Sequence, residues 1–253
     1  MMKNYNTEIR KLQEISALNK SEFLEMDTYC KYPNQKVSIC MHPASRFGAY
    51  HVHDFFEINY VYTGKCLNFI DGKTITMEQG SLVLMNAGTF HTVYSFNDSI
   101  IYNILLRKSW FTETLCHYSL PESPAGKFIS ASKKPSYFKY LFYSSVPSDI
   151  KETLEELFAN KESNPLLIES ITLKLFVQFL ELEKGRLSEV RGSADDIMLR
   201  ILSHISTNYS TVTLDSLSKT FGYSPTHICR LFNKNIGKII NKILCVFHCI
   251  ICR

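Results

Sequence analysis

The sequence lacks any long apolar run. No stretch of its 253 residues approaches the length of a membrane-spanning helix. Residues 1–20 carry a charge every few positions, where a signal peptide needs an apolar core. These absences argue against a membrane-spanning protein and indicate no export route, so we expect a cytoplasmic protein without a membrane partner. The eight cysteines are then reduced thiols and not a disulfide framework.

A large net charge is also missing, because the chain carries only +4 at neutral pH. The charge is nevertheless uneven. Residues 186–253 contain nine Lys and Arg against four Asp and Glu, a net charge of +5, which leaves residues 1–185 near −1. Positive charge at one end favours phosphate binding, because neutralised phosphates release counterions. Hydrophobic residues make up 45% of the chain, enough for a core and, at this length, for more than one domain.

Short runs rich in Val, Ile, Phe and Tyr occupy residues 36–106 and are separated by turn residues. The clearest is LNFI-DG-KTITM, where Asp71 and Gly72 supply the two positive-φ positions of a tight hairpin. Several short strands at this spacing predict a β-barrel or sandwich. Residues 107–146 are ambiguous, because prolines interrupt any long element at Pro121, Pro124 and Pro135.

Helical periodicity begins at Ser148. A first helix opens with a Ser/Asp cap, and Pro165 starts a second helix that closes at Gly185. The short connection predicts an antiparallel helical hairpin. The second helix is apolar over more than one stripe, so either it packs against the barrel and its partner helix or it also offers a dimer face. The polar segment 185–195 contains two glycines and predicts a domain boundary.

The segment TLDSLSKTFGYSPTHICRLFNKNIG has the pattern of a helix-turn-helix. Thr213 caps a short helix, Gly222 supplies the turn, and Ser224 caps a second helix whose first residue is Pro225. A further amphipathic helix is expected before them, at residues 196–210. In this arrangement the second helix is presented to the major groove of DNA.

The second helix of this motif has candidate DNA-contacting residues. If its apolar residues are buried, the outward side chains are Thr226, His227, Cys229, Arg230 and Lys234. Arg230 is the main candidate for base readout, since its planar fork can bind guanine O6 and N7 together, whereas Lys234 suits a phosphate. The alternative is an ordinary three-helix bundle with a solvated basic face.

A second group of candidate residues lies in the β-rich part. His51, His53 and Glu57 have the same parity, so on one strand their side chains point to one face. His91 follows a hairpin and a strand later and completes three imidazoles and one carboxylate, a set suited to Fe, Mn, Ni or Zn. We call these four residues the His/Glu cluster. Nearby aromatic residues either wall this site or serve ordinary packing: Tyr60, Tyr62, Phe69 and Tyr94.

Two parts of the chain resemble AraC/XylS-type transcription regulators. Residues 201–238 resemble the first half of their DNA-binding domain, and FGYSPTHICRLFNKNIGK is the most specific stretch. The upstream strands resemble their cupin sensor domain. HVHDFFEINYVYTG and GSLVLMNAGTFHTVYS are similar to the two cupin metal motifs, with Asn86 where proline is usual and Ser95 where asparagine is usual. The resemblance covers about residues 35–240.

This resemblance implies a homodimeric regulator that binds double-stranded DNA and a small-molecule effector, for which a sugar is the family-level expectation. In that family the recognition helix enters the major groove with the side chains that correspond to Thr226, Cys229 and Arg230. The effector is expected at the open end of the barrel, against the His/Glu cluster. The cluster residues then hydrogen-bond the effector or one another, and a divalent metal on them is the alternative.

The C-terminus departs from the family. AraC/XylS-type regulators continue through a long linking helix into a second helix-turn-helix, whereas here INKILCVFHCIICR follows. The spacing of Cys245, His248, Cys249 and Cys252 fits no paired zinc knuckle. We therefore expect a truncation or a shifted reading frame, with weakened DNA binding.

The sequence thus predicts an α+β protein with a cupin-like β-barrel and a helical hairpin, followed by an incomplete all-α helix-turn-helix domain. The expected segments are an N-terminal arm (1–35), the effector-sensing barrel (36–146), the helical hairpin (147–185), a linker (186–194) and the DNA-binding domain (195–253). The expected function is effector-dependent, sequence-specific regulation of transcription, without enzymatic activity or a required cofactor. Two alternatives stay open: a metal-dependent cupin oxygenase or isomerase that uses the His/Glu cluster, and a dimerisation fragment that does not bind DNA.

Overall fold

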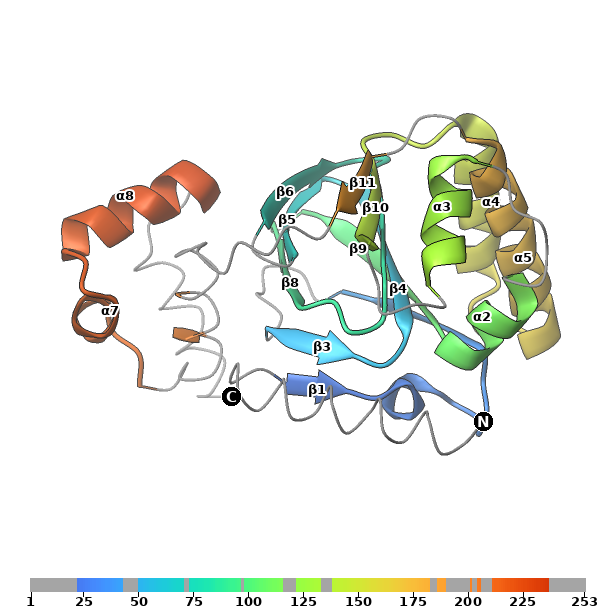
Figure 1. Ribbon diagram of the computed structural model, residues 1–253, viewed down its shortest axis with the longest axis horizontal. Coiled ribbons are helices and arrows are strands. Elements are labelled where there is room, and N and C mark those ends of the chain that lie inside the picture. The colour runs from blue at the N-terminus through green and yellow to red at the C-terminus, as the bar shows by residue number, and fades with distance from the viewer. Residues whose placement is uncertain are drawn as a thin grey trace.

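Two β-sheets that face one another form the centre of the molecule (Figure 1). Helices cover the outer side of one sheet, and two further helices lie beyond the outer side of the other. The structure, a computed structural model, describes residues 22–42, 50–70, 73–96, 98–115, 122–132, 138–182, 186–189, 201, 204–205 and 211–236.

The strands of the five-stranded sheet are, in spatial order, β1 (Glu22–Leu24), β3 (His51–His53), β8 (His91–Ser95), β5 (Lys65–Ile70) and β6 (Lys73–Glu78). Those of the six-stranded sheet are β11 (Arg186–Glu189), β10 (Phe138–Tyr143), β7 (Leu82–Met85), β4 (Phe56–Thr63), β9 (Ile100–Leu106) and β2 (Val37–Met41). The predicted β5–β6 hairpin is confirmed, because these strands pair antiparallel from Ile70 opposite Lys73 onward. Its Asp71-Gly72 turn lies outside the described residues.

Successive side chains of β4 point to opposite faces of the six-stranded sheet. Phe56 and Ile58 belong to the core cluster shared with the helices, whereas Val61 belongs to an apolar cluster between the two sheets. Glu57 and Asn59 share the parity of Val61 and are also buried. The interior of the barrel therefore contains polar side chains next to apolar ones.

The outer face of the six-stranded sheet is covered by α2 (Lys108–Leu115), α3 (Pro124–Ala131), α4 (Ser148–Ala159) and α5 (Pro165–Glu181) (Figure 1). As predicted, α5 begins at Pro165, and the Asn164 side chain caps it by accepting from a backbone N–H at 2.9 Å. The Ser/Asp cap expected for α4 is wrong, because Pro147 is the N-cap and Ser148 already lies in the helix. Within the described residues, no helix has both the length and the apolarity needed to cross a membrane.

Residues 107–146, which the sequence left ambiguous, contain α2, α3 and β10. Pro124 starts a helix here and does not break one, because the Ser123 side chain caps α3 and proline fits its first position. β10 pairs with β7, and β11 pairs with β10 at the far edge of the sheet. β11 occupies the start of the expected linker, so residues 186–189 belong to the sheet.

Beyond the five-stranded sheet lie α7 (Leu214–Phe221) and α8 (Pro225–Ile236), which we call the helical pair (Figure 1). Thr213 caps α7 through a reciprocal capping box: its hydroxyl accepts from the N–H of Ser216 at 3.1 Å, and the Ser216 hydroxyl accepts from the N–H of Thr213 at 2.8 Å. The hydroxyl of Ser224 caps α8. The predicted caps of both helices are confirmed.

The turn between α7 and α8 depends on Gly222, whose φ of 70° lies in the left-handed region. A Cβ at this position meets nothing within 4 Å, so only backbone strain opposes a side chain. We expect Gly222→Ala to lower the free energy of unfolding of the helical pair by about 1–2 kcal/mol. Gly222→Asn should cost less, because asparagine tolerates this conformation better. Urea denaturation followed by far-ultraviolet circular dichroism measures both, and equal costs would contradict the argument.

Candidate ligand-binding site

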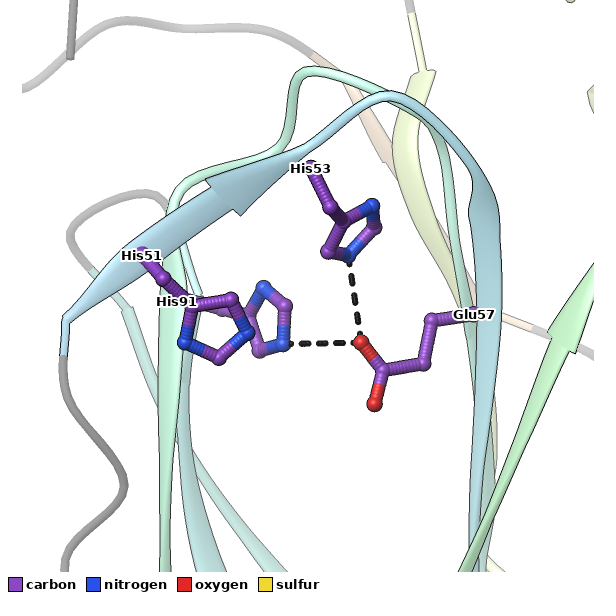
Figure 2. A group of neighbouring side chains, drawn as sticks. All are labelled: His51, His53, Glu57 and His91. Carbon is purple, nitrogen blue, oxygen red and sulfur yellow. Dashed lines mark ion pairs between the residues drawn. The ribbon is translucent and has the colours of Figure 1, made fainter. Parts of the chain in front are cut away.

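The His/Glu cluster lies between the two sheets (Figure 2). His51 and His53 come from β3, His91 comes from the adjacent β8, and Glu57 comes from β4 in the opposite sheet. One ring nitrogen of each histidine and one oxygen of Glu57 all lie within 4.8 Å of one another. The four residues that the sequence singled out therefore meet in one place.

Shared parity on one strand, the predicted reason for this convergence, is wrong. β3 ends at His53, a bend at Asp54 and Phe55 follows, and the chain then enters β4 in the other sheet. The side chains of His53 and Glu57 meet because β3 and β4 face each other across the barrel (Figure 2). The site thus links the two sheets and is not confined to the face of one strand.

Two of the imidazoles point at the same carboxylate oxygen. Nε2 of His53 lies 3.1 Å from Oε2 of Glu57, and Nε2 of His91 lies 3.2 Å from it (Figure 2). The three side chains are buried. The ring of His51 stands edge-on to that of His91, with centroids 4.2 Å apart, and is only partly buried. The cluster therefore borders the surface at His51.

Backbone carbonyls determine which nitrogen of each buried ring carries hydrogen. Nδ1 of His53 lies 2.6 Å from the carbonyl oxygen of Phe55, and Nδ1 of His91 lies 3.3 Å from that of Thr89. Because a carbonyl can only accept, each Nδ1 donates, and in a neutral imidazole Nε2 then carries a lone pair. Within the described residues neither Nε2 has a hydrogen-bond partner. Each ring therefore pairs with the Glu57 carboxylate through Nε2 only when it carries a second proton, as an imidazolium.

The charge state of the cluster follows from its surroundings. Burial by itself raises the pKa of Glu57, but His91 and His53 outweigh burial and hold this pKa well below its usual range. For His53 burial dominates and lowers the pKa, although Glu57 acts in the opposite direction. An ionised carboxylate in a buried space attracts a positive charge.

An unpredicted chain of asparagine side chains holds the other oxygen of Glu57. Nδ2 of Asn59 donates to Oε1 of Glu57 at 2.9 Å and to Oδ1 of Asn103 at 3.0 Å, and Nδ2 of Asn68 donates to Oδ1 of Asn59 at 2.7 Å. The chain joins β4, β5 and β9 and so spans both sheets. A signal was present in the sequence: Asn68 and Asn103 stand in apolar strands, where a buried amide needs partners.

The aromatic residues considered as walls of the site lie elsewhere. Tyr60 and Tyr62 pack against Phe158 on the helical side of the six-stranded sheet. Phe69 and Tyr94 belong to a cluster on the outer face of the five-stranded sheet. A surface hollow of about 480 Å³ lies at the turn between β4 and β5 and includes no residue of the His/Glu cluster.

The predicted DNA-contacting residues lie on α8. Of these, the described side chains are the exposed Thr226, His227 and Arg230 and the half-buried Cys229. Lys234 lies in the last turns of α8, whose side chains are outside the described part of the chain. Ile228 and Phe232 are fully buried on the other side of the helix.

The fold and the His/Glu cluster together define a β-barrel ligand-binding domain with a helical hairpin. The family model of the AraC-like ligand binding domain matches residues 35–176, more than half of the chain. The protein therefore belongs to the AraC-like ligand binding domain family, as its resemblance to AraC/XylS-type regulators predicted. The matched region includes the His/Glu cluster and ends within α5, so the helical pair lies beyond it.

Several solved structures are similar to the chain, whereas no curated protein gives a significant match. Apo ToxT from Vibrio cholerae is 13% identical, with 82% of this chain and 77% of that chain covered and a TM-score of 0.40. The AraC-like transcriptional activator CuxR is 10% identical, with coverages of 75% and 64% and a TM-score of 0.35. KdgF from Halomonas sp. is 18% identical, with coverages of 29% and 71% and a TM-score of 0.27. The family assignment rests on residues 35–176 and not on these likenesses.

Proposed function

We propose that the protein is a ligand-responsive transcription regulator in which the barrel binds a small ligand at the His/Glu cluster and the helical pair binds double-stranded DNA as a helix-turn-helix. The ligand-binding half is supported by membership of the family. The observation that carries the DNA-binding half is the two-sided character of α8. Ile228 and Phe232 are fully buried, while Arg230 on the other side is exposed.

The exposed side of α8 has the chemistry of a recognition helix. Thr226 and His227 stand in its first turn, which enters the major groove first in a helix-turn-helix. Arg230 follows one turn later, and its planar fork matches guanine O6 and N7. Cys229 borders this surface, and Lys234, one turn beyond Arg230, suits a phosphate. These five residues form the proposed DNA-contacting set.

The proposed domains begin at residues 1, 36, 147 and 195, as the sequence predicts, with the linker shortened because β11 extends to Glu189. Residues 237–253 lie outside the described part of the chain, so the expected C-terminal truncation stays a prediction. The homodimer also stays a prediction. Most apolar residues of α5 pack inward, and those that are exposed are Leu166, Leu167 and Val177.

The five-stranded sheet provides a physical connection between the two proposed sites. In β8, His91 belongs to the His/Glu cluster, while Tyr94 has the opposite parity and belongs to a buried apolar cluster on the outer face of the sheet. We call this second group the outer cluster. It also includes Phe69 of β5 and, from the helical pair, Leu217, Ile228 and Phe232. A ligand that binds two arrangements of the sheet with unequal affinity therefore changes how α8 is held.

Sequence-specific binding is tested by selecting tight binders from a pool of random DNA duplexes and then titrating the selected duplex in gel shifts. We expect Arg230→Ala to weaken binding roughly 5- to 150-fold, because a bidentate guanine contact is worth about 1–3 kcal/mol. The same substitution should relax the base preference at one position. The affinity of the unaltered protein should fall linearly with salt on logarithmic axes, since phosphate contacts release counterions.

Two further variants make this test specific. Arg230→Lys keeps the charge but loses the planar fork, so it should retain phosphate attraction and still lose base preference. Lys151→Ala is the matched control, because Lys151 is an exposed cation on α4, away from the helical pair, and its removal should leave the affinity unchanged. Two outcomes would contradict DNA binding: selection enriches no duplex, or the Arg230→Ala protein binds as tightly as the Lys151→Ala protein. Either would favour the interpretation as a dimerisation fragment.

A further inference from the structure

Two aromatic side chains stack on one another where the turn between α7 and α8 meets α8. The ring centroids of Tyr223 and His227 are 4.9 Å apart, and the ring planes are inclined by only 14°. Tyr223 lies two residues before α8 begins, and His227 stands in its first turn. Both side chains are exposed, and the exposed fraction of Tyr223 is 37%. We call these two residues the Tyr/His stack.

The backbone holds the Tyr/His stack from both sides. Gly222, which precedes Tyr223, occupies the left-handed region that closes the turn. The hydroxyl of Ser218 on α7 donates to the carbonyl oxygen of Tyr223. Ser224, which follows Tyr223, caps α8 by accepting from the N–H of His227. Both stacked residues therefore belong to one tightly hydrogen-bonded turn.

The main consequence of the stack is a restriction of the imidazole. The side chains that stabilise the helical pair by burial are on its other side, where Ile228 and Phe232 are fully buried. A histidine in an exposed turn of a helix otherwise samples several rotamers. The flat neighbouring ring of Tyr223 favours those in which the two rings are parallel. The orientation of the imidazole is therefore set before anything binds to α8.

The restricted imidazole stands next to the side chain proposed to read a base. His227 and Arg230 are three residues apart and so are neighbours on the surface of α8. About 4.5 Å of helix rise separates them, which is close to the step of about 3.4 Å between base pairs. With Arg230 on one base pair, His227 therefore reaches the next. An imidazole N–H is a donor, and guanine O6 and N7 are acceptors in the major groove.

We propose that Tyr223 is a positioning residue for DNA recognition: by stacking on His227 it presents an imidazole N–H to a guanine next to the base pair read by Arg230. This inference rests on the proposed DNA-binding function and adds a residue outside α8 to those that determine specificity. Because the imidazole is already ordered in the free protein, DNA binding does not have to order it. Tyr223 thus raises the affinity for the correct sequence without touching a base.

The stack is tested in the free protein by proton NMR of the imidazole. Protons held over the face of an aromatic ring are shifted upfield by its ring current. We expect the ring protons of His227 to resonate upfield, to stay there in Tyr223→Phe and to move downfield in Tyr223→Ala. The spectrum of His227→Ala identifies these signals among those of the eight histidines. Signals that do not move in Tyr223→Ala would overturn the proposal.

The role in base reading is tested by gel shifts on the selected duplex and on duplexes changed at one base pair at a time. His227→Ala should weaken binding about tenfold and abolish the preference at one base pair. Tyr223→Ala should weaken binding about 2- to 10-fold, the order of what ordering one side chain costs, and reduce the preference at that same base pair. Arg230→Ala should act at the neighbouring base pair. Tyr223→Phe keeps the ring and should bind like the unaltered protein.

A double variant separates positioning from a merely structural role. If Tyr223 acts through the imidazole, Tyr223→Ala should change the affinity by no more than about twofold in a protein that already carries His227→Ala. A larger loss would show that Tyr223 supports the whole turn, and it would overturn the proposal. Tyr32→Ala is the matched control, because Tyr32 is 51% exposed and its neighbour Lys31 pairs with Glu162, just after α4. It should leave the affinity unchanged.

Failure of this inference can be told apart from failure of the proposed function. A duplex may be selected whose base preferences and affinity are the same in Tyr223→Ala as in Tyr32→Ala. That result would overturn the role of Tyr223 and leave the proposed DNA binding standing. A selection that enriches no duplex would overturn the proposed DNA binding, and the role of the Tyr/His stack in base reading with it.

Discussion

Phe56→Ala is expected to lower the free energy of unfolding by about 3–5 kcal/mol. Phe56 is fully buried on β4, and its ring centroid lies 4.0 Å from that of Phe111 and 6.4 Å from that of Phe128. The substitution leaves a cavity between the six-stranded sheet and its helices and removes these ring contacts. Because Phe56 directly precedes Glu57, the substitution also loosens the segment of β4 that carries the carboxylate. Urea denaturation followed by Trp110 fluorescence measures the change, since Trp110 on α2 belongs to the same core and is the single tryptophan.

Val177→Ala is the matched control for this prediction. Val177 lies on α5, which covers the same sheet, but its side chain is 57% exposed. Its truncation should change the free energy of unfolding by no more than about 0.5 kcal/mol. If Phe56→Ala shifts the urea midpoint as little as Val177→Ala, then Phe56 does not anchor the sheet to the helices.

Features specified by a few neighbouring residues could be predicted from the sequence. The caps at Thr213 and Ser224 each depend on a hydroxyl that reaches a backbone N–H three residues later. Gly222 follows the same logic, since a left-handed turn position favours glycine wherever it occurs in a fold. The helical pair was therefore predictable almost residue by residue. Its relation to DNA was not, because no local signal shows what binds the exposed side of α8.

Features that depend on which strands meet were harder to predict. Glu57 lies beside the histidines, but not for the predicted reason, because parity along a sequence does not reveal that the chain changes sheets at Asp54 and Phe55. β10 was missed for a similar cause: its partner β7 lies more than fifty residues earlier, and the pairing has no local signature. The positions of Pro121, Pro124 and Pro135 indicated breaks but not that Pro124 opens a helix.

The asparagine chain was the main omission at the site. Asn59 has the parity of Glu57, and Asn68 interrupts the apolar run LNFI, so both were visible as polar residues in buried strands. Their significance lies in contacts between different strands, Asn68 to Asn59 and Asn59 to Glu57. The residue types of the His/Glu cluster stand out in the sequence, whereas the groups that orient their side chains are set by the packing of the two sheets.

The largest effect on DNA binding is expected from a residue that faces away from the DNA. Phe232 is fully buried in the outer cluster, and Phe232→Ala should remove about 3–5 kcal/mol of packing free energy. Two short helices have little stability of their own, so this loss exceeds what holds α8 in place. We expect the affinity for the selected duplex to fall more than about a hundredfold, although Arg230 and its exposed neighbours are unchanged. Gel-shift titration measures the loss, and far-ultraviolet circular dichroism reports the helices.

Phe232→Leu and the barrel itself serve as controls for this prediction. Leucine keeps most of the buried volume, so Phe232→Leu should restore much of the affinity. The midpoint reported by Trp110 should move little in either variant, because Trp110 lies in the core on the other side of the barrel, against the six-stranded sheet. A Phe232→Ala protein that binds DNA as tightly as Phe232→Leu would show that the orientation of α8 does not depend on the outer cluster. The five-stranded sheet would then have no route by which a ligand at the His/Glu cluster controls DNA binding.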